Sequence, residues 1–137
     1  MSLLPGAEEL VAAARAAAAG AYAPYSDFPV GAAVRCEDGR IYTGANVENA
    51  SYGLGICAER VAVAGAAAQG RRRVEAVAVW TGSDPPSAPC GACRQFLLEF
   101  CPRPEDVSVH LAGPATVRSF HLSDLLPHPF RFQRSKE

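Results

Sequence analysis

Two stretches organise this sequence: Cys57-Ala58-Glu59 and Pro89-Cys90-Gly91-Ala92-Cys93. Each is expected to open a helix, where unpaired backbone N–H groups and the positive end of the helix dipole stabilise a thiolate. Cys90 and Cys93 are three positions apart, so their sulfur atoms lie on one helical face and can reach one ion. The spacing therefore predicts a metal site built from Cys57, Cys90 and Cys93.

The ligand set and its neighbouring carboxylate indicate the kind of metal site. Zinc accepts thiolates in tetrahedral geometry, and three protein ligands leave the fourth position open for water. A structural site does not need Glu59, but a carboxylate two residues from a ligand can take a proton from zinc-bound water. The alternative is a structural site closed by a fourth cysteine, for which Cys36 and Cys101 are the remaining candidates. We favour a catalytic site with one Zn²⁺ per subunit.

Composition indicates a globular chain that acts on small molecules. Of 137 residues, 49% are hydrophobic and 20% are charged, and 14 acidic residues nearly balance 13 basic ones. This balance gives no field that would attract nucleic acid or an anionic membrane. The basic run 71–73 is too short for a nucleic-acid surface, and the apolar run 61–68 is too short to span a bilayer. We expect one domain over residues 1–137.

Cysteine usage and the amino terminus predict the compartment. The chain has five cysteines, an odd number, and its C-x-x-C spacing is typical of metal or redox chemistry in a protein without secretory features. Glu8 and Glu9 stand where a signal peptide would carry positive charge. We therefore expect a cytoplasmic protein.

Propensity, periodicity and turn signals predict alternating helices and strands. The helices are expected over 5–20, 57–69 and 90–100, with a last helical turn over 124–126 capped by Ser123. The strands are expected over 28–37, 40–46, 73–81, 107–112 and 117–122, with hairpin pairing of the first two and of the last two. These elements predict a mixed sheet covered by helices, an α/β fold built as one unit.

Several further blocks accompany the two cysteine stretches: Tyr22-Ala23-Pro24-Tyr25-Ser26, Val30-Gly31-Ala32-Ala33, Asn46-Val47-Glu48-Asn49, Arg94-Gln95 and Leu125-Leu126-Pro127. With these blocks the chain resembles the small homotetrameric zinc-dependent cytidine deaminases over nearly its whole length. The resemblance implies a three-layer α/β/α fold with a five-stranded mixed sheet. It also implies Cys57, Cys90 and Cys93 as zinc ligands and Glu59 as the proton shuttle. The implied reaction, part of pyrimidine salvage, is hydrolytic deamination of free cytidine and 2′-deoxycytidine with release of ammonia.

The resemblance also assigns the residues around the substrate. Phe28 is expected to pack against the nucleoside, Asn46 and Glu48 to bind the ribose hydroxyls, and the backbone N–H of Ala58 to meet the pyrimidine O2. Asn46 and Glu48 are two positions apart on a predicted strand, so they are expected on one face; from the residues alone they could equally be polar residues at a strand end. The Glu48 carboxylate should repel a phosphate, which predicts a preference for nucleosides over nucleotides.

Arg60 follows Glu59 and resembles the family arginine that hydrogen-bonds a ligand sulfur and withdraws charge from it. This matters because three thiolates and Zn²⁺ sum to a net negative charge, which weakens the metal as a Lewis acid. The alternative is an ordinary surface arginine on the helix.

The second helix predicts an assembly, because residues 61–68 are apolar on every side, which a surface helix cannot be. A subunit interface is the favoured interpretation, and burial within one chain is the alternative. The family tetramer completes each active site with residues of neighbouring chains. Tyr52 and Phe130 match these contributors, although Phe132 competes with Phe130 for the assignment.

Two other functions remain open from the sequence. One is a deaminase of another compound resembling an aminopyrimidine, such as blasticidin S, and the other is a zinc-stabilised binding module without activity. Polynucleotide deaminases usually place histidine where Cys57 stands, and they need a basic surface. Release of ammonia from cytidine separates the favoured function from the binding module.

Overall fold

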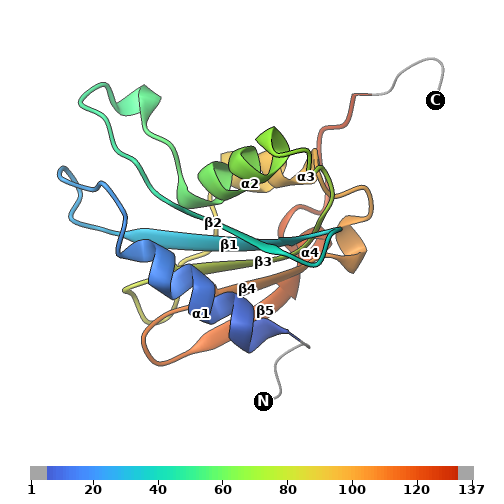
Figure 1. The fold of residues 1–137 in the computed structure, drawn as a ribbon, viewed down its shortest axis with the longest axis horizontal. Coiled ribbons are helices and arrows are strands. Elements are labelled where there is room, and N and C mark those ends of the chain that lie inside the picture. Colours follow the sequence, from blue (N-terminus) through green and yellow to red (C-terminus); the bar gives the residue numbers. More distant parts are fainter. Residues whose placement is uncertain (1–5, 133–137) are drawn as a thin grey trace.

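The computed structural model describes residues 6–132 as a five-stranded sheet with helices on both faces (Figure 1). The strand order is β2-β1-β3-β4-β5; β3 and β4 are parallel, and the other neighbours are antiparallel. The strands are β1 (Val30–Cys36), β2 (Ile41–Ala45), β3 (Val74–Thr81), β4 (Ser108–Ala112) and β5 (Val117–His121). The helices are α1 (Ala7–Ala18), α2 (Ala58–Ala68), α3 (Gly91–Leu98) and α4 (Leu122–Leu125), with 3-10 turns η1 (Tyr52–Leu54) and η2 (Pro104–Asp106). This architecture confirms the predicted α/β class with a mixed five-stranded sheet.

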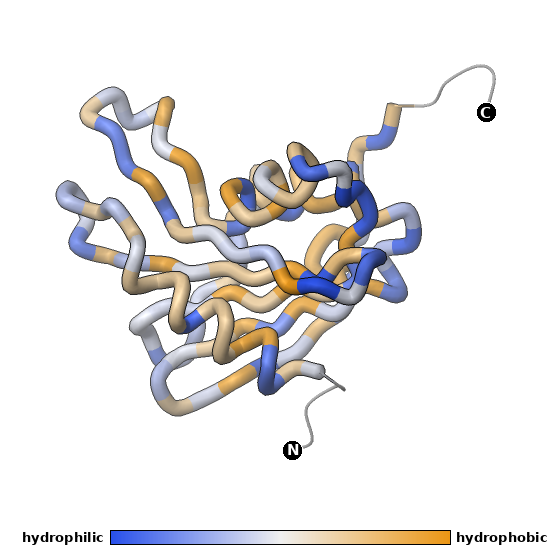
Figure 2. Tube along the Cα trace, viewed as in Figure 1, coloured by the Kyte–Doolittle hydropathy of each residue, from blue (hydrophilic) through white to orange (hydrophobic). Residues whose placement is uncertain are grey.

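Side chains alternate between the two faces of the sheet, and each face packs under different helices. Val34, Val77 and Val79 belong to the larger core cluster, which includes buried residues of α2 and α3. Ala33 and Ala78 face the other way and pack with Leu10 and Ala14 of α1 in a second cluster. Figure 2 shows hydrophobic positions along the strands and on the helices that cover them. Within residues 6–132, no helix has the length and apolar character needed to cross a membrane.

Most predicted elements are present, with shifted ends. The first predicted helix included Pro5, which lies outside the described residues. β1 begins at Val30 and not at Phe28, because Pro29 cannot donate to the ladder and Asp27 has a left-handed backbone with φ 55°. The last helix is Leu122–Leu125, so the prediction that Ser123 caps it is wrong. His121 occupies the cap position, and its backbone N–H donates to the Asp124 carboxylate at 3.0 Å.

Close contact between β2 and α2 sets the position of the first cysteine stretch. A Cβ atom at Gly44 of β2 would lie 2.5 Å from the backbone nitrogen of Ala62 and 2.8 Å from the carbonyl oxygen of Ala58. Such distances leave no room for a side chain, so the backbone of α2 rests directly on the strand. This contact holds the amino-terminal end of α2, and with it Cys57 and Glu59, against the sheet.

Two segments extend beyond the sheet at the end where α2 begins. They are the α1–β1 connection and the β2–α2 connection, which lie next to each other in Figure 1. An isolated bridge between Tyr22 and Val47 joins the two connections to each other, and a second one, between Val47 and Ile56, lies within the β2–α2 connection. Their exposed rings include Tyr22, Tyr25 and Tyr52. These segments form the rim around the candidate site.

Candidate metal centre and active site

Three sulfur atoms meet where α2 and α3 begin. Cys57 is the residue before α2 and Cys90 is the residue before α3; both have extended backbone angles, and Cys93 lies in the first turn of α3. The three Sγ atoms lie within 4.8 Å of one another. The helix starts therefore converge on one point, which is the arrangement that a shared ion requires.

The donor set fits zinc. A tetrahedral zinc ion with Zn–S bonds of about 2.3 Å needs sulfur atoms roughly 3.8 Å apart, which the separation limit of 4.8 Å accommodates. In the part of the chain that the structure describes, no fourth histidine, cysteine or carboxylate joins the group. Cys36 and Cys101 are fully buried in the larger core cluster, so the alternative of a fourth cysteine ligand has no support. Three ligands leave one coordination position for water.

The charges around the sulfur group favour a thiolate at Cys57. Arg60 Nη2 donates to Cys57 Sγ at 3.7 Å, and the half-buried arginine lies one turn along α2. Hydrogen bonding from the Cys93 thiol, followed by hydrogen bonding from Arg60, lowers the pKa of Cys57 to about 5. A thiolate is the form that binds a metal. Within residues 6–132, Arg60 is the one cationic side chain that donates a hydrogen bond to a sulfur atom of this group.

Glu59 is a buried carboxylate beside the sulfur group. It is 4% exposed, and in residues 6–132 it is the one acidic side chain that is buried. Desolvation raises its pKa, and the nearby Cys57 thiolate raises it further. Perturbed carboxylates in a cavity are typical of groups that accept and return protons. Glu59 is therefore placed to exchange protons at the metal site, and it is not one of the three residues that supply the sulfur ligands.

A cavity of about 180 Å³ is lined both by these groups and by residues of the sheet. Six of the residues predicted for the site line it. The lining consists of Phe28, Val30, Asn46, Cys57, Ala58, Glu59, Val79, Thr81, Ser87, Ala88 and Cys90.

Asn46 fixes the position of Phe28 at the mouth of this cavity. Its Oδ1 accepts from the Val30 backbone N–H at 2.9 Å, and its Nδ2 donates to the Phe28 carbonyl at 3.0 Å. The amide is thereby engaged on both sides with the segment that carries the ring. A hydroxyl group of a substrate can share these atoms because a carbonyl oxygen has two lone pairs.

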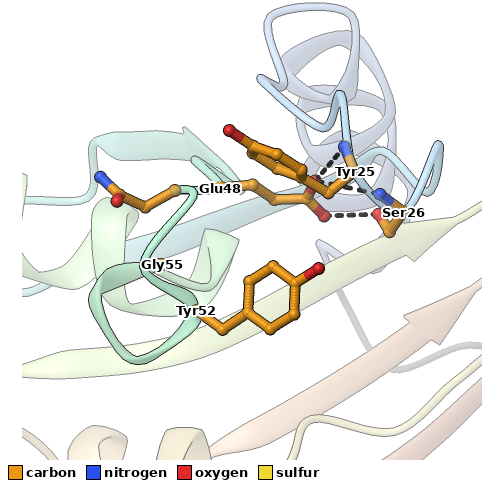
Figure 3. A pocket seen from close by; sticks show the side chains of 6 residues that line it. Tyr25, Ser26, Glu48, Tyr52 and Gly55 are labelled. Carbon is orange, nitrogen blue, oxygen red and sulfur yellow. Dashed lines mark hydrogen bonds between the residues drawn. The ribbon is translucent and has the colours of Figure 1, made fainter.

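Glu48 lies in a neighbouring hollow and not in the cavity with Asn46. The hollow of about 320 Å³ is lined by Tyr25, Ser26, Glu48, Asn49, Tyr52 and Gly55. Figure 3 shows the Glu48 carboxylate pointing at the Tyr25–Ser26 turn, where both backbone N–H groups donate to Oε1, at 3.0 and 3.1 Å, and the Ser26 hydroxyl donates to Oε2. β2 ends at Ala45, so Asn46 and Glu48 lie just beyond it, where the Tyr22 N–H donates to the Asn46 carbonyl at 2.9 Å and the Glu48 N–H donates to the Tyr22 carbonyl at 2.8 Å.

Two predicted contributors are largely exposed and do not line the cavity of their own chain. Tyr52 is 82% exposed at η1, where its ring meets Tyr25 edge-on at 6.2 Å. Phe130 is 72% exposed, but its backbone is held at both ends, because Gln95 Nε2 donates to its carbonyl at 2.7 Å and its N–H donates to Gln95 Oε1 at 3.2 Å. No hydrogen bond of this kind holds Phe132 in the described chain.

Some residues of the site have no local signal in the sequence. Thr81 and Ser87 line the cavity, and Gln95 holds the tail, although none of them had an assigned role. Gln95 adjoins the second cysteine stretch, yet its partner lies 35 positions away. Thr81 could have been suspected as a polar residue at the end of an apolar strand.

A three-thiol site beside a buried carboxylate, on this three-layer fold, defines a zinc-dependent deaminase.

Comparisons with known proteins agree with this class. The family model for the cytidine and deoxycytidylate deaminase zinc-binding region matches residues 5–110, and the chain belongs to this family. A cytidine deaminase of Halalkalibacterium halodurans is 49% identical over 81% of this chain and 83% of the relative. One of Mycobacterium tuberculosis is 47% identical over 83% of this chain and 81% of the relative. The crystal structure of a cytidine deaminase from Burkholderia pseudomallei superposes with a TM-score of 0.84 at 48% identity, covering 90% of this chain and 98% of that one.

The two remaining cysteines provide a test of the site. A thiol reagent added at pH 8 should leave Cys36 and Cys101 unmodified, since burial raises the pKa of Cys36 to about 11 and that of Cys101 to about 12. Only about 1 in 1,000 Cys36 side chains is then the reactive thiolate. Removing zinc with a chelator should make Cys57 and Cys90 reactive, and peptide mass spectrometry should locate the label on these two residues, since Cys93 is as buried as Cys36. Rapid labelling of Cys36 or Cys101 in the folded chain would contradict the prediction.

Proposed function

We propose that this chain is a cytidine deaminase that hydrolyses free cytidine and 2′-deoxycytidine to uridine and 2′-deoxyuridine with release of ammonia, a reaction of pyrimidine salvage. The observation that carries the proposal is the buried Glu59 carboxylate, which shares one small cavity with Cys57 and Cys90. The names of the relatives support the same substrate. The test is ammonia release from cytidine by the zinc-loaded protein, with blasticidin S as the competing substrate.

The residues of the cavity account for the proton transfers of this reaction. Zinc, when held by the three sulfur atoms, lowers the pKa of a water molecule from ~15.7 toward ~7. Glu59 accepts a proton from the attacking water and donates it to N3 of the pyrimidine, which makes C4 electrophilic. The C4–O bond then forms, Glu59 takes the remaining proton from the new C4 hydroxyl and delivers it to the amino group, and the C4–N bond breaks to release ammonia as C4 becomes a carbonyl. The raised pKa of Glu59 suits a group that must both accept and donate protons.

The remaining contacts hold the base and the sugar. Ala58 is the first residue of α2, where a backbone N–H has no acceptor within the helix, and it lines the cavity. We assign this N–H to the pyrimidine O2 and the ring of Phe28 to the face of the base. Asn46, at the cavity mouth, and Glu48, in the adjoining hollow, are assigned to the ribose hydroxyls. Arg60 is assigned to the Cys57 sulfur, which keeps the zinc site from becoming too electron-rich.

Glu48 makes the proposed substrate choice testable. Hydrogen bonds from Ser26, first its hydroxyl and then the backbone groups of the turn, lower the pKa of Glu48, so that it is ionised at neutral pH. We expect kcat/KM for cytidine to exceed that for CMP by at least about tenfold, since like charges repel. Glu48→Gln should bring the two kcat/KM values closer together. Their ratio is the quantity to compare, because a substitution that only disturbs the Tyr25–Ser26 turn lowers kcat/KM for both substrates. Equal kcat/KM values for the two substrates would contradict the assignment.

We further propose that four copies of the chain assemble and share their active sites. One side of α2 is buried, but the side formed by Val61, Ala64, Gly65 and Ala68 is partly or fully exposed, so burial within one chain does not explain its apolar character. Tyr52 and Phe130 are exposed rings that a neighbouring copy can receive.

A cytoplasmic location is proposed because a site made of free thiols suits a reducing compartment.

A further inference from the structure

The segment that leads to Cys90 has almost no backbone support. Pro85, Pro86 and Pro89 remove three possible N–H donors from it. Within residues 6–132, none of the residues 82–88 takes part in a backbone–backbone hydrogen bond. Ser87 and Ala88 nevertheless form a wall of the cavity, immediately before the metal ligand. The position of this wall therefore depends on side-chain contacts.

Three hydroxyl groups connect the end of the sheet to this wall. Thr81, the last residue of β3, is 2% exposed, and its Oγ1 lies 2.8 Å from Ser83 Oγ. Ser83 Oγ lies 3.2 Å from Ser87 Oγ, and the Ser83 N–H donates to Thr81 Oγ1 at 3.4 Å. Thr81 and Ser87, which carry the first and the last of these three hydroxyl groups, both line the cavity that contains Glu59. A buried hydroxyl is costly unless it is hydrogen-bonded, and Thr81 meets that need within the segment itself.

A second contact holds the same segment from the other side. The Asp84 carboxylate accepts from the Ala115 N–H at 3.2 Å and from the Thr116 hydroxyl at 2.9 Å, both in the turn between β4 and β5. Gly113 lies so close that a Cβ atom there would be 2.1 Å from the Ser83 carbonyl oxygen. The turn therefore supports the outer part of the segment, and Thr81 supports the part next to the cavity.

We propose that Thr81 is a positioning residue of the metal centre, acting through Ser83 and Ser87 to fix the segment that places Ala88 and Cys90. If the Thr81 hydroxyl is removed, Ser83 loses a partner for both its hydroxyl and its N–H. No backbone hydrogen bond within residues 82–88 is available to compensate, and the Pro89 carbonyl, which accepts from Arg94 Nε at 2.8 Å, is then the remaining hydrogen-bonded point before Cys90, so the approach of Cys90 to the other two sulfur atoms is less firmly held. The expected effect on turnover rests on the proposed function, whereas the expected effect on zinc retention does not.

The test compares Thr81→Val, which keeps the shape of the side chain, with Thr81→Ser, which keeps the hydroxyl, in the zinc-loaded full chain. We expect Thr81→Val to transfer zinc to a chelator about tenfold faster than the parent and to lower kcat about tenfold with a smaller change in KM. Thr81→Ser should stay within about twofold of the parent. The matched control is Ser119→Ala, which removes a hydroxyl that lies 2.8 Å from the buried His110. His110 pairs with Ala78, on the sheet face that packs against α1.

Ser83→Ala gives a second route if Thr81→Val does not fold. It should accelerate zinc transfer similarly. Where Thr81→Val folds, the effects in the double variant should be less than additive, because both substitutions break the contact between the Thr81 and Ser83 hydroxyl groups. Zinc transfer and kcat that match the parent in Thr81→Val and Ser83→Ala, with a loss of Tm no different from that of Ser119→Ala, would overturn the proposal. Additive effects in the double variant would overturn it as well. If the parent releases no ammonia from cytidine, the zinc-transfer rates still decide the role of Thr81.

Discussion

Glu59→Gln should lose nearly all turnover while keeping zinc, fold and assembly. The carboxylate is buried in the cavity beside the sulfur group but is not one of the three ligands, and the amide of glutamine has nearly the same shape. An amide cannot accept and return a proton, and removal of a positioned acid–base group typically costs ~10²–10⁴-fold in rate. Steady-state assay of ammonia release, together with zinc analysis by mass spectrometry, should show a large fall in kcat at unchanged metal content.

The matched control for this substitution is Glu75→Gln, the same chemical change at an exposed position on β3. It should leave kcat and zinc content unchanged. Loss of stoichiometric zinc in Glu59→Gln would mean that the carboxylate supports the ligands. Turnover close to that of the parent would mean that another group moves the protons. Either result would remove the assignment on which the proposed reaction depends.

The sequence was sufficient to predict the metal ligands because their geometry is set locally. Cys90 and Cys93 are fixed relative to each other by one helical turn, and Cys57 needs only a second helix start at the same place. The fold class could be predicted as well, since apolar residues on both faces of β1 and β3 require helices packed on both faces of the sheet. Each of these features follows from periodicity, which a sequence records directly.

Features that depend on distant segments could not be predicted in the same way. The partner of the Glu48 carboxylate is such a feature, because it is a turn more than 20 positions earlier in the chain. The hydroxyl chain from Thr81 depends on how a proline-containing segment folds back on the strand end. Local propensity does not specify such contacts, because their partners are brought together only by the complete fold.

The tail provides the second large expected effect. Gln95 holds the backbone of Phe130 on α3 while the ring stays 72% exposed, so the ring is presented outward in a fixed place. Phe130→Ala should therefore lower kcat/KM by about 10–100-fold, as expected for an anchoring aromatic side chain, with zinc content unchanged. Phe132→Ala is the matched control and should stay close to the parent. If Phe132→Ala lost more kcat/KM than Phe130→Ala, Phe132 would be the ring that reaches the neighbouring site.

A mixing experiment decides whether that ring serves another chain's cavity. Glu59→Gln and a chain truncated before Phe130 should each be nearly inactive. In a tetramer with shared sites, random exchange of equal amounts gives about a quarter of the pockets an intact Glu59 from one chain and an intact tail from another. Activity should then rise toward that fraction of the parent value, because the two defects lie in different chains. A fully active monomer by light scattering would contradict the shared site, and mixed tetramers without recovered activity would show that the tail acts within its own chain.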